Sequence, residues 1–177
     1  MNKISNKLKQ FAFYWLTSFA IAIVGYYLLW IIMPNHWVFG SWFRMFKYHW
    51  QHPIQYIAIP CFFYGIFATI FSSKFLKLKS IRRIILTLII AILVIIISSP
   101  FGGMLWHYHD MQAGYFPQNW FFKILKLGFS GGLTMGWLIV GLSVPYNILG
   151  VVVAYFLTRK GALIFQDLPP EGEKNSH

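Results

Sequence analysis

Four long apolar runs limit what this chain can fold into, because each is long enough to cross the hydrocarbon core of a bilayer as a helix. They cover residues 11–33, 54–71, 84–104 and 128–157. Hydrophobic residues make up 58% of the chain and charged residues 11%, whereas soluble domains carry about 25% charged residues. We therefore predict an all-α membrane protein in which four transmembrane helices form one bundle.

Two prolines and a polar C-terminal stretch mark features of this predicted membrane domain. Pro34 stops the first run, and Pro145 should tilt or kink the fourth, which is longer than a straight span requires. The first run reaches residue 33 without a small-residue cleavage pattern, so we interpret it as a retained helix rather than a signal peptide. Residues 1–165 are thus predicted to be one membrane domain, and the polar residues 166–177 a disordered cytoplasmic tail.

The positive charges of the chain alternate between the two sides of this predicted bundle. Basic residues beside membrane spans are retained on the cytoplasmic side. One side holds Lys3, Lys7, Lys9, Lys74, Lys77, Lys79, Arg82, Arg83, Arg159, Lys160 and Lys174. The other side holds only Arg44, Lys47, Lys123 and Lys126. We therefore expect both termini in the cytoplasm, and the Ile-rich spans favour a bacterial inner (plasma) membrane.

Each of the two outer loops contains a stretch with the pattern of a short amphipathic helix. In the first loop, Ser41 can cap a helix that places Trp42 and Phe43 on one side and Arg44 toward the other. In the second loop, Asn119 can cap a helix in which aromatic and aliphatic residues alternate with lysines. Both stretches are predicted to lie in the headgroup layer as interfacial helices.

Histidine and tryptophan gather on the predicted outer face. The histidines there are His36, His49, His52, His107 and His109. The tryptophans at or near it are Trp30, Trp37, Trp42, Trp50, Trp106 and Trp120, a distribution typical of the aromatic belt at a membrane interface. As candidate binding residues we single out His36, His49, His52, Trp42, Trp106 and Arg44.

The densest polar cluster on that face is His107, His109 and Asp110. Asp110 is the only carboxylate outside the tail, and a carboxylate near lipid requires a partner. A histidine held by a carboxylate is the usual arrangement of a general base or of an oriented metal ligand. The cluster is therefore the candidate catalytic group. Histidines that simply suit the headgroup layer, or that bind a metal or haem, remain open alternatives, and the sequence identifies no cofactor.

Glycines recur every four residues at Gly128, Gly132 and Gly136, in the pattern of a glycine zipper. Such a stripe lets another helix backbone approach closely. Packing against the third span is the first expectation, and contact with another protein or another copy of the chain is the alternative.

Several classes of function are disfavoured by the sequence. The four predicted spans lack Asp, Glu, Lys, Arg and His, which argues against a stand-alone ion-coupled transporter. Cys61 is the only cysteine, so no internal disulfide or CxxC pair can form. Basic residues fall between spans rather than on one soluble face, so a nucleic-acid partner is not expected despite the net charge of +11.

Three functions remain. The first is an accessory, regulatory or self-protection (immunity) protein that binds another molecule through its aromatic and histidine-rich outer face and its glycine-striped helix. Its partner would be another membrane protein or a second copy of the chain. The second is an intramembrane enzyme that uses His107, His109 and Asp110 on a lipid or lipid-linked substrate at the outer leaflet. The third is binding of a metal or haem. Membrane lipid is a partner in all three.

Overall fold

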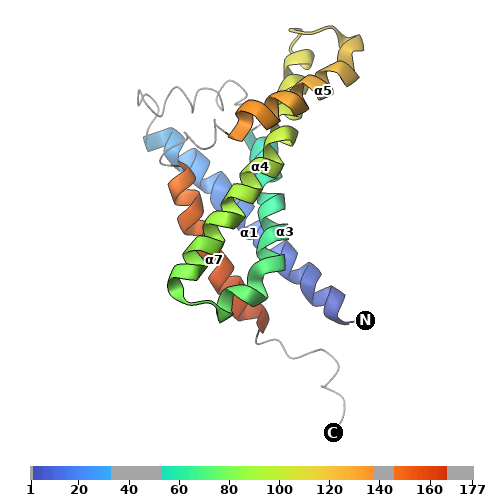
Figure 1. Ribbon diagram of the computed structural model, residues 1–177. Coiled ribbons are helices and arrows are strands. Elements are labelled where there is room, and N and C mark those ends of the chain that lie inside the picture. Colours follow the sequence, from blue (N-terminus) through green and yellow to red (C-terminus); the bar gives the residue numbers. More distant parts are fainter. Residues whose placement is uncertain (1, 33–52, 138–145, 167–177) are drawn as a thin grey trace.

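The structure, a computed structural model, describes residues 2–32, 53–137 and 146–166, and within these ranges the chain is helical without any strand (Figure 1). In chain order the elements are α1 (Asn2–Ile32), α3 (Pro53–Lys77), α4 (Ser80–Gln112), the 3-10 turn η1 (Gln118–Trp120), α5 (Phe121–Gly131), the π-helical η2 (Gly132–Gly136) and α7 (Tyr146–Gln166).

Four of these helices are long and apolar enough to cross a membrane. The segments that meet this condition are Ser5–Leu28, Ile54–Lys77, Ser80–Gln112 and Asn147–Phe165. The prediction of an all-α, multi-pass membrane protein with four apolar helices is confirmed to this extent.

The limits of the third and fourth spans differ from the prediction. The third helix continues from the predicted end at residue 104 as far as Gln112, so the histidine cluster lies on a helix. The described segment that meets the condition for a fourth span is Asn147–Phe165, whereas the prediction was 128–157, of which residues 138–145 lie outside the described residues. The glycines at the predicted start of that span belong to α5 and η2, which pack along α4. Pro145, the expected kink, lies outside the described residues.

The predicted short helix in the second outer loop is not a separate element. Its residues begin in η1 and continue through α5 directly into η2. Asn119 does not cap it, since Pro117 and Trp120 occupy the two cap positions and neither makes a side-chain cap hydrogen bond. The first predicted interfacial helix, with Ser41, Trp42 and Arg44, falls outside the described residues.

Polar side chains tie α1, α3 and α7 together inside the bundle. Tyr14 is fully buried, and its hydroxyl donates to the Thr158 carbonyl at 3.2 Å. The Tyr64 hydroxyl donates to the Ala154 carbonyl at 3.1 Å and lies 2.9 Å from the Thr158 hydroxyl, which can donate to it. Because lipid offers no hydrogen bonds, polar groups within spans must find partners on neighbouring helices. These contacts therefore fix how the three helices pack.

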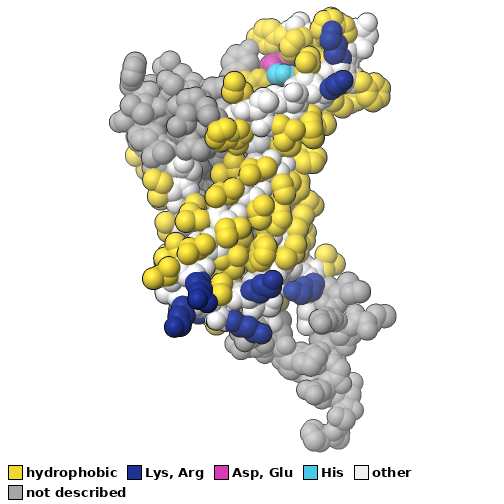
Figure 2. Space-filling model, in the orientation of Figure 1, with side chains coloured by type: hydrophobic (Ala, Val, Ile, Leu, Met, Phe, Trp, Pro, Cys, Tyr) yellow, Lys and Arg dark blue, Asp and Glu magenta, His cyan; other side chains and the backbone are white. Residues whose placement is uncertain are grey.

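One end of the bundle, called the basic end below, is formed where α1 begins, α3 ends, α4 begins and α7 ends. Lysines and arginines form a rim below the apolar surface there (Figure 2). The turn from α3 to α4 is very short, and Arg83 crosses it. Its Nε donates to the Leu78 carbonyl at 2.8 Å and its Nη2 to the Leu76 carbonyl at 3.0 Å. Arg83 thus satisfies carbonyl groups at the end of α3 that the helix itself leaves unpaired.

At the opposite end, α4 and α5 lie side by side and extend beyond the other labelled helices (Figure 1). We call residues 106–131 the arm: it comprises the last turns of α4, the connection that follows, η1 and α5. A Cβ atom at Gly128 would lie 2.6 Å from the Met104 Cα, and one at Gly103 would lie 2.9 Å from the Gly132 nitrogen. Glycine is therefore required on both sides for the two backbones to approach this closely.

Candidate functional site

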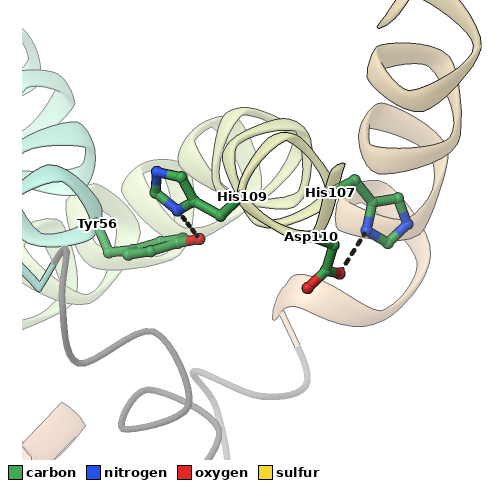
Figure 3. Close-up of polar contacts among 4 residues, drawn as sticks. All are labelled: Tyr56, His107, His109 and Asp110. Atoms are coloured by element: carbon green, nitrogen blue, oxygen red, sulfur yellow. Dashed lines mark hydrogen bonds and ion pairs between the residues drawn. The ribbon is translucent and has the colours of Figure 1, made fainter. Parts of the chain in front are cut away.

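The candidate catalytic residues lie on the last turns of α4, and helix geometry separates the two histidines. Successive residues of an α-helix are about 100° apart around its axis, so residues two apart point to nearly opposite sides. His109 accordingly faces Tyr56 on α3, whereas His107 and Asp110 lie on the other side of α4 (Figure 3). The three residues therefore form two separate contacts rather than one acid-base group.

His109 is a buried packing residue. Its side chain is only 7% exposed, and Nδ1 lies 2.9 Å from the Tyr56 hydroxyl (Figure 3). The two rings also meet edge to face, with centroids 5.6 Å apart. This contact joins the end of α4 to the start of α3. A ring enclosed in this way is poorly placed to exchange protons with a substrate.

His107 and Asp110 form the more accessible contact. His107 Nδ1 lies 3.8 Å from Asp110 Oδ2, with the side chains 32% and 14% exposed (Figure 3). This distance allows an ion pair when the imidazole is protonated, but it exceeds the roughly 2.6–3.2 Å of a hydrogen bond that could orient a general base. Burial disfavours the charged form of Asp110, the one carboxylate of the described residues, whereas its interactions with His107, Trp106 and His109 favour that form.

Aromatic residues surround this second contact. The His107 ring lies against Phe116, with centroids 6.0 Å apart, and Tyr108 meets Phe121 edge to face at 6.3 Å. Gln118 donates to the Met111 carbonyl at 3.0 Å. The histidine cluster thus sits where the end of α4 meets the connection to α5, and these contacts hold the arm together.

The other predicted binding residues divide into two groups. Trp106 lies beside Asp110, as described above. Trp42, Arg44 and the remaining outer histidines, His36, His49 and His52, fall outside the described residues. Across the described ranges, no three histidine, cysteine or acidic side chains come together in a way that could hold a metal ion.

The glycine stripe lies against α4. A Cβ atom at Gly132 would lie 2.6 Å from the Pro100 Cα, and one at Gly136 would lie 2.9 Å from the Ser99 Cβ. Together with Gly128, these residues line the face of α5 and η2 that contacts the third apolar helix. The stripe is therefore occupied within the chain and is not a free surface.

Two features of the structure were missed by the sequence analysis. Tyr56 was not singled out, because a single tyrosine near the start of an apolar run is typical of membrane interfaces. The bonded cluster of Tyr14, Tyr64 and Thr158 was also missed, because its members come from three different spans. Only the occurrence of hydroxyl groups within apolar runs could have indicated them.

Comparison with known proteins adds no name to this site: no protein-family model, no curated protein and no solved structure matches the chain.

Proposed function

We propose that this chain is a non-catalytic accessory or regulatory membrane protein, in the class that includes self-protection (immunity) proteins. It would bind another membrane protein through its outer face. The arm carries this proposal. α4 has 33 residues, which at about 1.5 Å each gives roughly 50 Å, whereas the hydrocarbon core is about 30 Å thick. α4 is therefore about 20 Å longer than an untilted span requires, and we place the arm beyond the region that lipid chains cover.

Large aromatic side chains are nevertheless exposed on the arm. Phe122 is 83% exposed and Tyr115 is 64% exposed. Exposed apolar residues are ordinary where lipid surrounds them, but beyond the hydrocarbon core they are typical of binding surfaces. Aromatic residues are also enriched at protein–protein interfaces. These two side chains support a protein partner.

The contacts of the histidines support the same function. His109 is buried against Tyr56, and His107 packs on Phe116 beside Asp110. Each imidazole thus holds the arm in place, which an interaction protein requires. An enzyme would need at least one imidazole hydrogen-bonded and directed toward a substrate.

The proposal includes the orientation of the chain in a bacterial inner (plasma) membrane, with both termini in the cytoplasm. The basic rim at one end of the bundle supports this orientation (Figure 2). The arm then lies at the outer leaflet. On it, the Lys123 ammonium lies 3.7 Å from the centre of the Trp120 ring, a pairing suited to the headgroup layer.

Site-specific photo-crosslinking in intact membranes tests the proposal. A photo-reactive residue at Phe122 should give a discrete adduct with one other protein. The same residue at Ile92, which is also exposed but lies in the middle of α4, should give only lipid adducts. Replacing Tyr115 by Ser in the Phe122 variant should reduce the protein adduct several-fold, because the loss of a buried aromatic contact weakens an interface by about 1–2 kcal/mol.

Two outcomes would contradict the accessory role. Lipid adducts alone at both positions would show that the arm has no protein partner. An adduct of twice the mass of the chain would show that the arm binds a second copy instead of another membrane protein, contrary to the proposal.

The His107 and Asp110 pair favours a second candidate function, an enzyme that acts on a lipid or lipid-linked substrate at the outer leaflet. The pair is partly accessible and contains the only carboxylate of the described residues. Purified protein would then convert a membrane lipid extract, and His107→Gln or Asp110→Asn would lower the rate at least 100-fold. His109→Phe would leave more activity than either. Unchanged lipid in this assay would exclude the enzyme.

A further inference from the structure

A pocket opens at the basic end of the bundle, far from the arm. It has a volume of about 380 Å³ and is lined by Lys77, Arg83 and Arg159 together with Leu76 and Leu163. These residues come from the end of α3, the start of α4 and the last turns of α7. Its volume is at the lower end of the roughly 300–1,000 Å³ that small-molecule sites occupy.

The arginine at the centre of this pocket is held in place. The two hydrogen bonds from Arg83 to the carbonyls of Leu78 and Leu76 use its Nε proton and one proton on Nη2. A guanidinium carries five N–H protons, so three remain to bind a ligand. Because the side chain is already ordered by the backbone, little conformational entropy is lost when an anion binds.

The charges in the pocket are not balanced by acidic residues of the described chain. Asp110 is the only acidic residue in the described ranges, and it lies at the opposite end of α4. Three cations that line one pocket repel each other, and an anion relieves this repulsion. The positive-inside rule explains why the cations lie on this side of the membrane. It does not explain why three of them line one pocket.

We propose that this pocket binds the phosphate groups of an anionic phospholipid. The phosphate contacts Lys77, Arg83 and Arg159, and the acyl chains follow the apolar surface that begins at Leu76 and Leu163. The two leucines favour a lipid over free phosphate, because they give the pocket an apolar wall. A cardiolipin-type lipid with two phosphates balances three cations better than a lipid with one. Basic pockets between helices at this side of a membrane suit such headgroups.

Native mass spectrometry of the full-length protein in detergent tests this proposal. The protein is titrated separately with cardiolipin, phosphatidylglycerol, phosphatidylcholine and inorganic phosphate. The test variant is Lys77→Gln with Arg159→Gln. The control is Lys74→Gln with Lys79→Gln, which removes the same charge from exposed positions of the same end that do not line the pocket. Arg83 is left unchanged because it also holds the turn.

The proposal predicts that cardiolipin binds more tightly than phosphatidylglycerol and that phosphatidylcholine binds least. One cation near a membrane surface contributes about 1 kcal/mol to anionic lipid binding, which is roughly fivefold in affinity. The test variant should therefore lose about 25-fold in cardiolipin affinity, and the control less than about threefold.

Three results would overturn the proposal. Equal losses in the two double variants would show only diffuse attraction to the basic end. Equal binding of cardiolipin and phosphatidylcholine would show that no anion site exists. If millimolar inorganic phosphate displaced cardiolipin, the pocket would be a site for free phosphate rather than for a lipid. None of these outcomes depends on whether the arm binds a protein.

Discussion

At the scale of single residues, hydrogen bonds inside the bundle explain why some tyrosines lie within the spans, although composition alone would place them at the membrane interface. The many aromatic residues of the sequence suggested an interfacial belt, yet Tyr14 and Tyr64 are buried within the spans and bonded to α7. Tyr56 plays the same part at the start of α3, where it meets the buried His109. In each case the hydroxyl group has a partner that lies far away in the sequence.

The contact between Tyr56 and His109 can be tested by removing one oxygen atom. Tyr56→Phe should lower the free energy of unfolding by about 1–2 kcal/mol, because His109 Nδ1 would be left buried without its partner. The matched control is Tyr108→Phe, since the Tyr108 hydroxyl only accepts an exposed hydrogen bond from Gln112 at 2.7 Å. Thermal unfolding in detergent, followed by tryptophan fluorescence, gives the comparison. Equal effects of the two substitutions would show that the His109 contact adds no stability.

Three residues of the candidate site could be singled out from the sequence, but neither their arrangement nor Tyr56, the partner of His109, could be. His107, His109 and Asp110 stand out by type and by proximity along the chain. Whether the two histidines converge depends on the backbone, because an extended chain places residues two apart on one side and a helix places them on opposite sides. The apolar run ends near residue 104, so hydropathy gave no reason to extend the helix through them.

At the scale of elements, the glycine stripe predicted that its helix packs against the third span, and α5 does pack against α4, whereas the apolar pattern alone did not indicate this pairing. Hydropathy detects that a segment is apolar but not whether it continues straight across a bilayer or folds back along its neighbour. Residues 128–157 were therefore predicted to be one span. The glycine spacing contained the missing information, because Gly128 and Gly132 place the backbone of α5 directly against α4.

Two adjacent glycines provide a test of this pairing. Gly132→Ala should destabilise the protein by about 1–3 kcal/mol, because its Cβ would lie 2.6 Å from the Pro100 Cα of α4. Gly131→Ala should be neutral or stabilising by up to about 1 kcal/mol, since a Cβ there has no atom within 4 Å and both residues have right-handed helical dihedral angles.

Thermal unfolding of the two alanine variants in detergent measures this difference. Because the variants differ only in which side of the helix carries the added methyl group, helix propensity cannot explain opposite signs. Similar melting temperatures for both variants would show that α5 does not pack against α4 through Gly132.

At the scale of the whole molecule, the two ends of the bundle have different chemistry. The basic end contains a pocket lined by three cations, whereas the arm at the other end exposes aromatic residues. The four long apolar helices of the described residues, and the basic residues that gather at one end of them (Figure 2), could be predicted, because both follow from the cost of placing polar groups in lipid. The arm could not be predicted, because the apolar run ends near residue 104 whereas the third helix continues as far as Gln112. The proposed partner and the proposed lipid thus bind at opposite sides of the membrane.

We predict that the basic end faces the cytoplasm and that the arm faces the outside of the cell. This orientation decides on which side of the membrane the proposed lipid and the proposed protein partner bind. In a Cys61→Ser background, which removes the buried native thiol, single cysteines are placed at Tyr115 on the arm and at Lys79 on the basic end, both exposed positions. A membrane-impermeant maleimide should label the cysteine at 115 in intact cells and the cysteine at 79 only after the membrane is opened, because basic loops are retained in the cytoplasm. The reverse pattern would place the cationic pocket outside the cell and the arm inside, so an outer-leaflet partner for Phe122 would be excluded. Labelling at both positions after permeabilisation confirms that each thiol is reactive, so a negative result in intact cells reports the side of the membrane.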